Sequence, residues 1–123
     1  MILSARELSD MNDSSNVEFL QIVEQSELPP GERLFVEVEG VPIVLFNVGG
    51  QFYAIGDVCT HDDGPLGEGE LDGYCIRCPR HGARFDIRNG KALSLPAVED
   101  TLSFPVRVVN GWIELGVPRK SKY

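Results

Sequence analysis

Histidine is scarce in this sequence, which contains only His61 and His81 among its 123 residues. Neither stands apart from cysteine, because His61 lies two positions after Cys59 and His81 lies three positions after Cys78. Cys75 is the only other cysteine. An odd number of thiols in a chain without a recognisable secretory leader argues against a disulfide framework. We therefore expect these thiols to bind a metal or to be buried.

Long apolar runs are also missing. No run approaches the roughly 20 residues that a transmembrane helix needs, and the first 16 residues lack the hydrophobic segment of a signal peptide. These absences predict a cytoplasmic protein with no membrane contact.

Cations are the minority charge: 11 Lys and Arg stand against 19 Asp and Glu, a formal net charge of -8. Nucleic-acid binding needs clustered cations, so we expect no nucleic-acid partner. An acidic surface suits docking to a basic face of another protein, but the same charge also serves solubility alone. Charge by itself leaves both interpretations open.

Helical periodicity is lacking after residue 17, where short β-rich segments are separated by turn residues instead. Apolar and polar residues alternate over 33–38, which is the period of a half-buried strand. "NVGG" (47–50) and Asn110–Gly111 are typical of hairpin turns. The pattern predicts a single all-β domain over 17–117, a small antiparallel sandwich or barrel, with a polar extension over 1–16 and a tail over 118–123.

The two Cys–His pairs form the pattern Cys59-x-His61, sixteen residues, then Cys78-x-x-His81. Thiolate and imidazole are ligands of zinc and of iron–sulfur clusters. Each pair lies on a segment rich in Gly, Pro or Asp, so we expect two loops that converge on one metal centre. A Cys₂His₂ zinc site is the alternative, although zinc knuckles usually carry two ligands of the same kind.

The pattern and its surroundings resemble the ferredoxin subgroup of the Rieske [2Fe–2S] proteins, over about residues 17–117. The similar stretches are "PPGERLFVEV", "FYAIGDVCTHDDGPL", "CPRHGARFDIRNGKAL" and "FPVRVVNGWIEL". The resemblance implies one [2Fe–2S] cluster, with Cys59 and Cys78 on one iron and His61 and His81 on the other. It also implies a cluster-binding subdomain over about 57–97, in which "LPA" (95–97) covers the cluster.

Other features narrow the function within that family. A Rieske oxygenase needs further histidines for a mononuclear iron, and both histidines here are already assigned. The extra cysteines that form a disulfide in high-potential members are replaced by Gly64 and Arg80. We therefore expect a reduction potential at the low end of the family range of about −150 to +300 mV. Two interpretations of Asp62 and Asp63 stay open: docking of a basic reductase, or solvated loop carboxylates without such a role. Cys75 is interpreted as a small core residue.

The sequence has no G-x-G-x-x-G motif for binding a nicotinamide cofactor. The function that the resemblance implies is a monomeric one-electron carrier, not an enzyme, that relays electrons from a flavin-dependent reductase to an oxygenase or other redox protein. Two alternatives stay open: a redox-sensing or iron–sulfur accessory module, and a protein similar to the small subunit of nitrite reductase.

Overall fold

The computed structural model describes residues 17–60, 62–97 and 99–118. The predicted extension over 1–16 and all but the first residue of the predicted tail lie outside these residues. The elements, in chain order, are β1 (Val17–Glu24), the 3-10 turn η1 (Gln25–Glu27), β2 (Arg33–Val38), β3 (Val41–Val48), β4 (Gln51–Gly56), β5 (Glu70–Asp72), β6 (Cys75–Arg77), β7 (Arg84–Asp86), β8 (Ser103–Phe104), β9 (Val106–Val109) and β10 (Trp112–Pro118).

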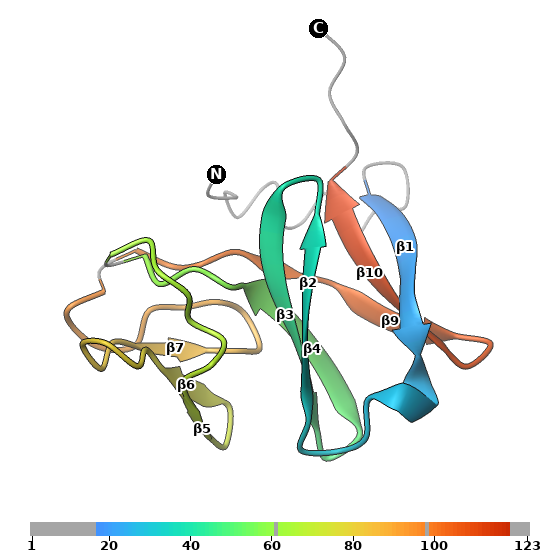
Figure 1. The fold of residues 1–123 in the computed structure, drawn as a ribbon, viewed down its shortest axis with the longest axis horizontal. Coiled ribbons are helices and arrows are strands. Elements are labelled where there is room, and N and C mark those ends of the chain that lie inside the picture. The colour runs from blue at the N-terminus through green and yellow to red at the C-terminus, as the bar shows by residue number, and fades with distance from the viewer. Residues whose placement is uncertain (1–16, 61, 98, 119–123) are drawn as a thin grey trace, which may run out of the picture.

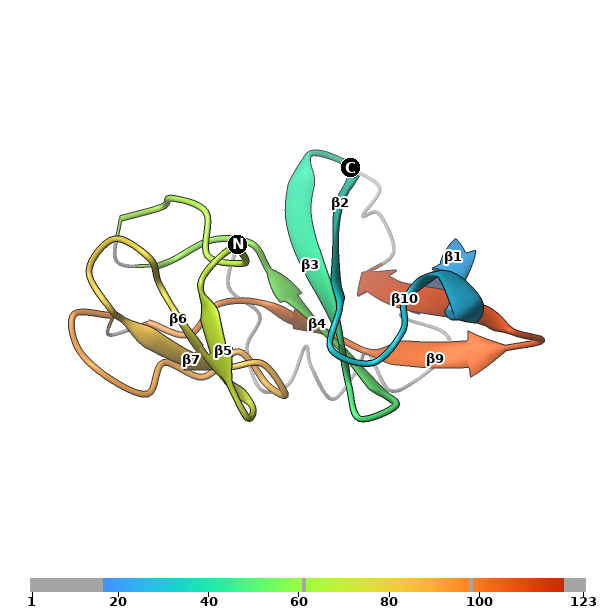
Figure 2. The same ribbon diagram turned by 60° about the horizontal axis from the view of Figure 1, so that its bottom comes forward.

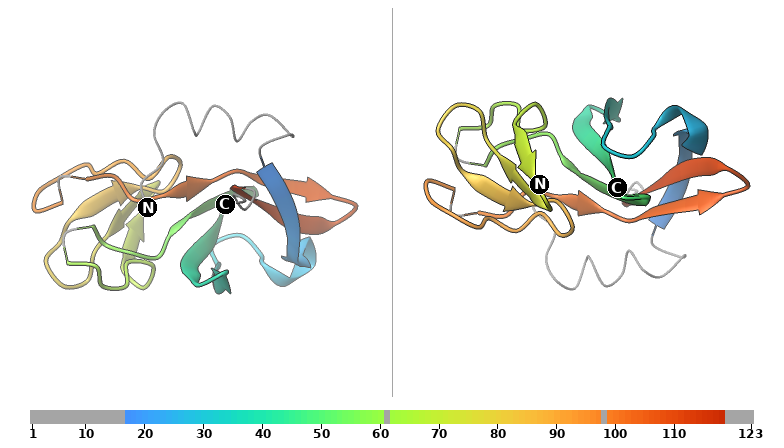
Figure 3. Two further views of the ribbon diagram at one scale, coloured as in Figure 1. Left: turned by 90° about the horizontal axis from the view of Figure 1, so that it is seen from above. Right: turned by 90° about the horizontal axis from the view of Figure 1, so that it is seen from below.

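The strands form three antiparallel sheets, in the orders β1-β10-β9, β2-β3-β4-β8 and β5-β6-β7. The small sheet β5–β7 stands to one side of the other two (Figure 1). We call residues 57–100, which include it, the tip, and the remaining strands the base. Turned views keep the tip at one end, the hairpin of β9 and β10 at the other, and β3 and β4 between them (Figures 2 and 3). The predicted all-β antiparallel fold is confirmed.

Both predicted hairpins are present. β3 and β4 are joined by Gly49 and Gly50, with φ of 61° and 93°, and β9 and β10 by Asn110 and Gly111, with φ of 52° and 82°. Two successive residues with positive φ give the turn a twist that matches the right-handed twist of the strands. Asn and Gly are the residues that adopt this backbone at least cost, which explains why the sequence signal was reliable.

β3 is buried on both faces and contributes to two separate cores. Ile43 and Leu45 pack in the base with residues of β1, β4 and β10. Val44 and Phe46, which point the other way because side chains alternate along a strand, pack in a second core beneath the tip. That second core also contains the cysteines of the predicted metal centre. The tip is thus packed directly against the central sheet.

Polar contacts fix the angle at which the chain enters the tip. Arg33 on β2 donates from Nη1 to the carbonyl oxygens of Gly67 and Gly69, at 2.5 and 2.8 Å. Asp57 Oδ1 accepts from the backbone N–H groups of Leu66 and Gly67 at 2.9 and 2.5 Å. These bonds close the loop between β4 and β5.

Within the described ranges, no helix combines the length and the apolar character needed to cross a bilayer.

Candidate metal centre

Three of the four predicted ligands, Cys59, Cys78 and His81, lie on two loops of the tip, which we call loop 1 (the described residues of 57–69) and loop 2 (residues 78–83). Cys59 and Cys78 are buried, with 0% and 1% of their surface exposed. The side chain of His81 is 57% exposed. His61 lies outside the described residues, so its predicted role stays a prediction.

The backbones of the two loops are matched. Cys59 donates its N–H to the carbonyl oxygen five residues later, that of Gly64, at 2.8 Å, and Cys78 does the same to Ala83 at 2.7 Å. The carbonyl oxygen of each cysteine accepts from the N–H four residues later, that of Asp63 at 2.7 Å and that of Gly82 at 3.0 Å. Each cysteine is therefore the first residue of a closed six-residue turn that fixes its backbone.

The two turns bring the cysteine sulfurs together. The Sγ atoms of Cys59 and Cys78 and a carboxylate oxygen of Asp62 all lie within 4.8 Å of one another. The three cysteines, all in the described part of the chain, are thiols rather than disulfides. Two buried thiols from separate loops, beside an exposed imidazole, fit a soft metal or an iron–sulfur cluster better than a hard cation.

The carboxylate of Asp62 is paired with the guanidinium of Arg80, and a role for Asp62 in docking stays a prediction. Arg80 Nε donates to Asp62 Oδ2 at 2.6 Å and Nη2 donates to Oδ1 at 3.0 Å. The hydrogen bonds from Arg80, with one from the Gly64 N–H, hold the pKa of the Asp62 carboxyl well below its usual range. His81 Nδ1 lies 3.6 Å from Asp62 Oδ2, an ion-pair distance when the imidazole is protonated. No motif in the sequence indicated this pairing.

A third segment, over 92–100, contacts the core that contains the cysteines; its residue 98 lies outside the described part. Ala97 is 4% exposed and packs in the same core as Cys59 and Cys78. Thr60 Oγ1 donates to the carbonyl oxygen of Glu99 at 2.5 Å, which joins this segment to loop 1. Leu95 is 77% exposed, so of residues 95–97 only Ala97 packs in that core, and the cover over 95–97 stays a prediction.

Cys75 is half-buried on β6 and belongs to neither core, so its interpretation as a core residue is wrong. The neighbouring Ile76 is fully buried in the core beneath the tip. Since side chains alternate along a strand, Cys75 and Arg77 face the other way. Among the described residues, the one group of His, Cys, Asp or Glu side chains close enough to hold a metal does not include Cys75.

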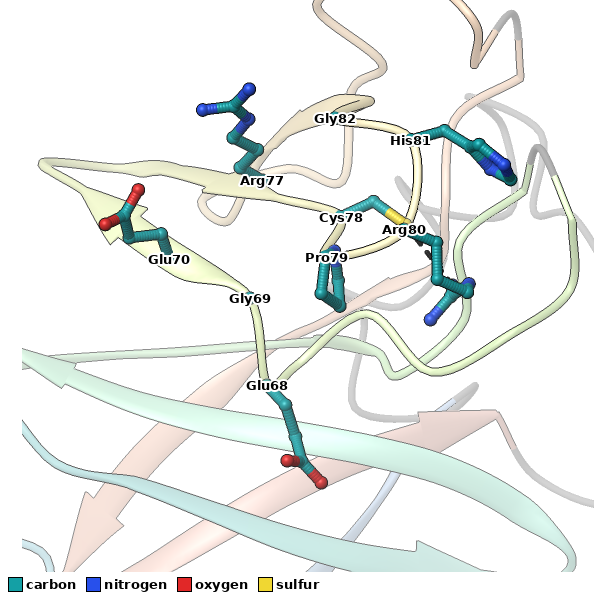
Figure 4. Close-up of a pocket in the computed structure, with 9 residues that line it drawn as sticks. All are labelled: Glu68, Gly69, Glu70, Arg77, Cys78, Pro79, Arg80, His81 and Gly82. Atoms are coloured by element: carbon teal, nitrogen blue, oxygen red, sulfur yellow. Dashed lines mark hydrogen bonds between the residues drawn. The ribbon is translucent and has the colours of Figure 1, made fainter.

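An open hollow lies beside loop 2 and is shown in Figure 4. The sulfur of Cys78 points toward Arg80, whereas Arg77 projects from the opposite side of the chain. Cys78 and His81 lie on the wall of this hollow, together with Glu68, Glu70 and Arg77. The centre is therefore approached from a polar, open face rather than through an enclosed substrate pocket.

An antiparallel β domain that brings two buried cysteines from separate loops together, beside the exposed imidazole of His81, fits the class of iron–sulfur electron-transfer proteins. The family model described as "Rieske [2Fe-2S] domain" matches residues 18–106. The chain belongs to the Rieske family, and it carries one [2Fe–2S] cluster as an electron-transfer component rather than a catalytic enzyme. This assignment favours the cluster over the zinc alternative.

Several relatives are ferredoxins of dioxygenase systems. The chain is 44% identical over 94 residues to the 3-phenylpropionate/cinnamic acid dioxygenase ferredoxin subunit of Escherichia coli (strain K12), covering 76% of this chain and 88% of the relative. It is similar to the ferredoxin of carbazole 1,9a-dioxygenase from Nocardioides aromaticivorans IC177, with a TM-score of 0.75, 29% identity and coverage of 82% and 98%.

A further match is a chain of a complex of reduced oxygenase and oxidised ferredoxin in carbazole 1,9a-dioxygenase. Its TM-score is 0.76 and its identity 35%, with 85% of this chain and 97% of that chain covered.

Proposed function

We propose that Cys59 and Cys78 bind one iron of the [2Fe–2S] cluster and that His61 and His81 bind the other. The observation that supports the cysteines is the approach of their buried sulfurs, delivered by two matched turns. The exposed imidazole of His81, on the loop that carries Cys78, supports its share. When bound, a Rieske cluster accepts and releases a single electron.

We further propose that the protein relays electrons from a flavin-dependent reductase to the oxygenase of a ring-hydroxylating dioxygenase system. The observation that carries this proposal is the asymmetry of the centre: the thiols are buried, whereas the side chain of His81 is 57% exposed. A partner that covers the imidazole side approaches closest to the redox centre. The ferredoxin names of the relatives and the oxygenase–ferredoxin complex among the similar structures support an oxygenase as acceptor.

The proposal also covers where the protein acts, its oligomeric state and its domain bounds. The protein acts as a cytoplasmic monomer, without nucleic-acid or membrane partners, through a Rieske domain over 17–117 whose cluster-binding subdomain spans about 57–97. The net charge of -8 supports docking to basic faces of the redox partners. Exposed carboxylates near the centre, such as Asp63 and Glu99, contribute to that charge.

The test is a reconstituted electron-transfer assay. The purified protein, reduced with dithionite, is expected to give a Rieske-type EPR signal with average g below 2. Stopped-flow mixing with a reduced flavoprotein reductase and then with an oxygenase, both from the 3-phenylpropionate dioxygenase system, should show reduction followed by reoxidation. A cluster that is reduced but never reoxidised by an oxygenase would favour the accessory or sensor role. A colourless protein with stoichiometric zinc would refute the ligand assignment.

A further inference from the structure

The guanidinium of Arg80, on loop 2, contacts three different groups around the metal centre. Nε and Nη2 donate to the carboxylate of Asp62, and Nη1 donates to the carbonyl oxygen of Pro65 at 2.8 Å. Both of these acceptors belong to loop 1. Nη2 also lies 3.2 Å from Cys78 Sγ, to which it donates. One planar group therefore joins loop 1, loop 2 and a cysteine sulfur, which is a geometry that lysine cannot reproduce.

Gly64 provides the space in which this guanidinium lies. A Cβ atom at Gly64 would lie 2.7 Å from Arg80 Cζ and from Nη2, well inside van der Waals contact. Gly64 also donates its N–H to Asp62 Oδ1 at 3.0 Å, which orients the carboxylate toward the arginine. The glycine thus permits this close approach, and a side chain at position 64 would force the Arg80 guanidinium to shift.

We propose that Arg80 is a positioning residue of the metal centre: lying against Gly64, it ties loop 1 to loop 2 and donates a hydrogen bond to Cys78 Sγ. This inference rests on the proposed ligand set, because it assigns Cys78 to the cluster. The tie holds both cysteines at the spacing that the cluster needs and slows loss of the cluster. The hydrogen bond withdraws electron density from the sulfur and raises the reduction potential.

The tie is electrostatic and partly open to solvent, with 33% of the Arg80 side chain and 23% of the Asp62 side chain exposed. Dissolved salt screens such a pair. We therefore expect retention of the cluster to decrease as the KCl concentration rises. Without Arg80, most of that salt dependence should disappear, because the screened interaction is absent.

The experiment compares the cluster-loaded protein with Arg80→Met and with Arg107→Met as the matched control. Arg107 forms an ion pair with Glu114 at 2.7 Å on strands of the base. The two variants make the same change in net charge, but only the first removes the tie. Two quantities are measured: the half-life of the visible absorbance in air, as a function of KCl, and the reduction potential in a dithionite titration followed by EPR.

For Arg80→Met we expect a half-life about fivefold shorter at low salt, a weaker salt dependence and a lower potential. Arg107→Met should match the parent protein in reduction potential, and any loss of half-life should match its loss of unfolding free energy, because it unpairs the buried Glu114 in the base. Arg80→Lys keeps the charge without the three-way geometry, so it should recover less than half of the lost half-life. Full recovery by lysine of both half-life and potential would overturn the tie and leave only a general effect of charge.

Gly64→Ala provides an independent test because it keeps Arg80 in the sequence but puts a methyl group in the space that its guanidinium occupies. Gly64→Ala alone should shorten the half-life about as much as Arg80→Met. In the double variant Gly64→Ala/Arg80→Met the two losses should not add, since both remove the same contact. Additive losses, or an Arg80→Met variant with the half-life and potential of the parent, would overturn the inference. A parent protein without a Rieske EPR signal would instead refute the proposed ligand set.

Discussion

Asp63 and Gly82 occupy the same position in two matched turns, each four residues after a buried cysteine. Each donates its backbone N–H to the carbonyl oxygen of its cysteine, and each has a positive φ, 61° for Asp63 and 78° for Gly82. Loop 2 places a glycine in this left-handed backbone, whereas loop 1 places an aspartate there. Aspartate tolerates the conformation better than most residues but still at a cost.

This comparison predicts opposite effects of two substitutions on stability. Asp63→Gly relieves backbone strain, partly offset by the greater freedom of glycine in the unfolded chain, and should stabilise the protein by about 0.5 kcal/mol. Gly82→Ala forces a β-carbon into the left-handed region and should destabilise it by roughly 1–2 kcal/mol. Urea unfolding monitored by tryptophan fluorescence measures both. A destabilised Asp63→Gly variant would mean that the aspartate side chain contributes more than its backbone costs.

The ligand assignment predicts distinct spectroscopic changes at two positions. Cys78→Ser should abolish the Rieske EPR signal, because a buried sulfur ligand is lost. His81→Cys exchanges a neutral ligand for an anionic one, so any cluster retained should have a lower reduction potential and an EPR signal closer to that of an all-cysteine cluster. Cys75→Ser, a matched change of a half-buried thiol outside the centre, should leave signal and potential unchanged. A His81→Cys potential equal to that of the parent would remove His81 from the ligand set.

The Asp86–Arg88 pair predicts part of the acid sensitivity of the fold. Hydrogen bonds from Arg88 hold the pKa of the buried Asp86 carboxyl below its usual range. Because this pKa is lower in the folded state than in the unfolded chain, the pair stabilises the protein above the ordinary aspartate pKa. That contribution is lost as the pH falls through the lowered value.

Asp86→Asn should therefore be less stable than the parent at pH 7, with a difference in unfolding free energy that shrinks toward pH 2. Urea unfolding across this range measures the difference. Asp72→Asn, an exposed carboxyl on β5 of the same small sheet, serves as the control. A difference for Asp86→Asn that stayed constant with pH would show that the lost contribution is packing rather than charge.

The contacts of Arg33 predict a local weakening where loop 1 leads into β5. Arg33→Met removes two hydrogen bonds to carbonyl oxygens, those of Gly67 and Gly69, and a cation–π contact in which Cζ lies 5.4 Å from the centre of the Phe46 ring. We expect a loss of about 1–2 kcal/mol of unfolding free energy. Compared with the parent protein, the variant should show a larger increase in hydrogen-exchange rate at the Leu66 and Gly67 amides than at the amides of β10. Equal acceleration across the whole chain would contradict a local effect.

Sequence reasoning succeeded where a local signal determines the structure. The Asn110–Gly111 turn follows from which residues adopt positive φ, and strand alternation follows from burial of one face. The pairing of Arg80 with Asp62 could not be predicted in this way, because it depends on how two loops meet after folding. The same limit explains Cys75, because the face on which the thiol lies is set by Ile76, which fills the core beneath the tip.

The burial of β3 on both faces has a consequence for how the protein unfolds. Its alternate side chains belong to two cores, one in the base and one that includes Cys59 and Cys78. Neither core can come apart without exposing one face of the same strand. We therefore expect the two cores to unfold in one cooperative transition. A substitution deep in the base, far from the cluster-binding loops, should then shorten the lifetime of the cluster, because it raises the population of the unfolded chain.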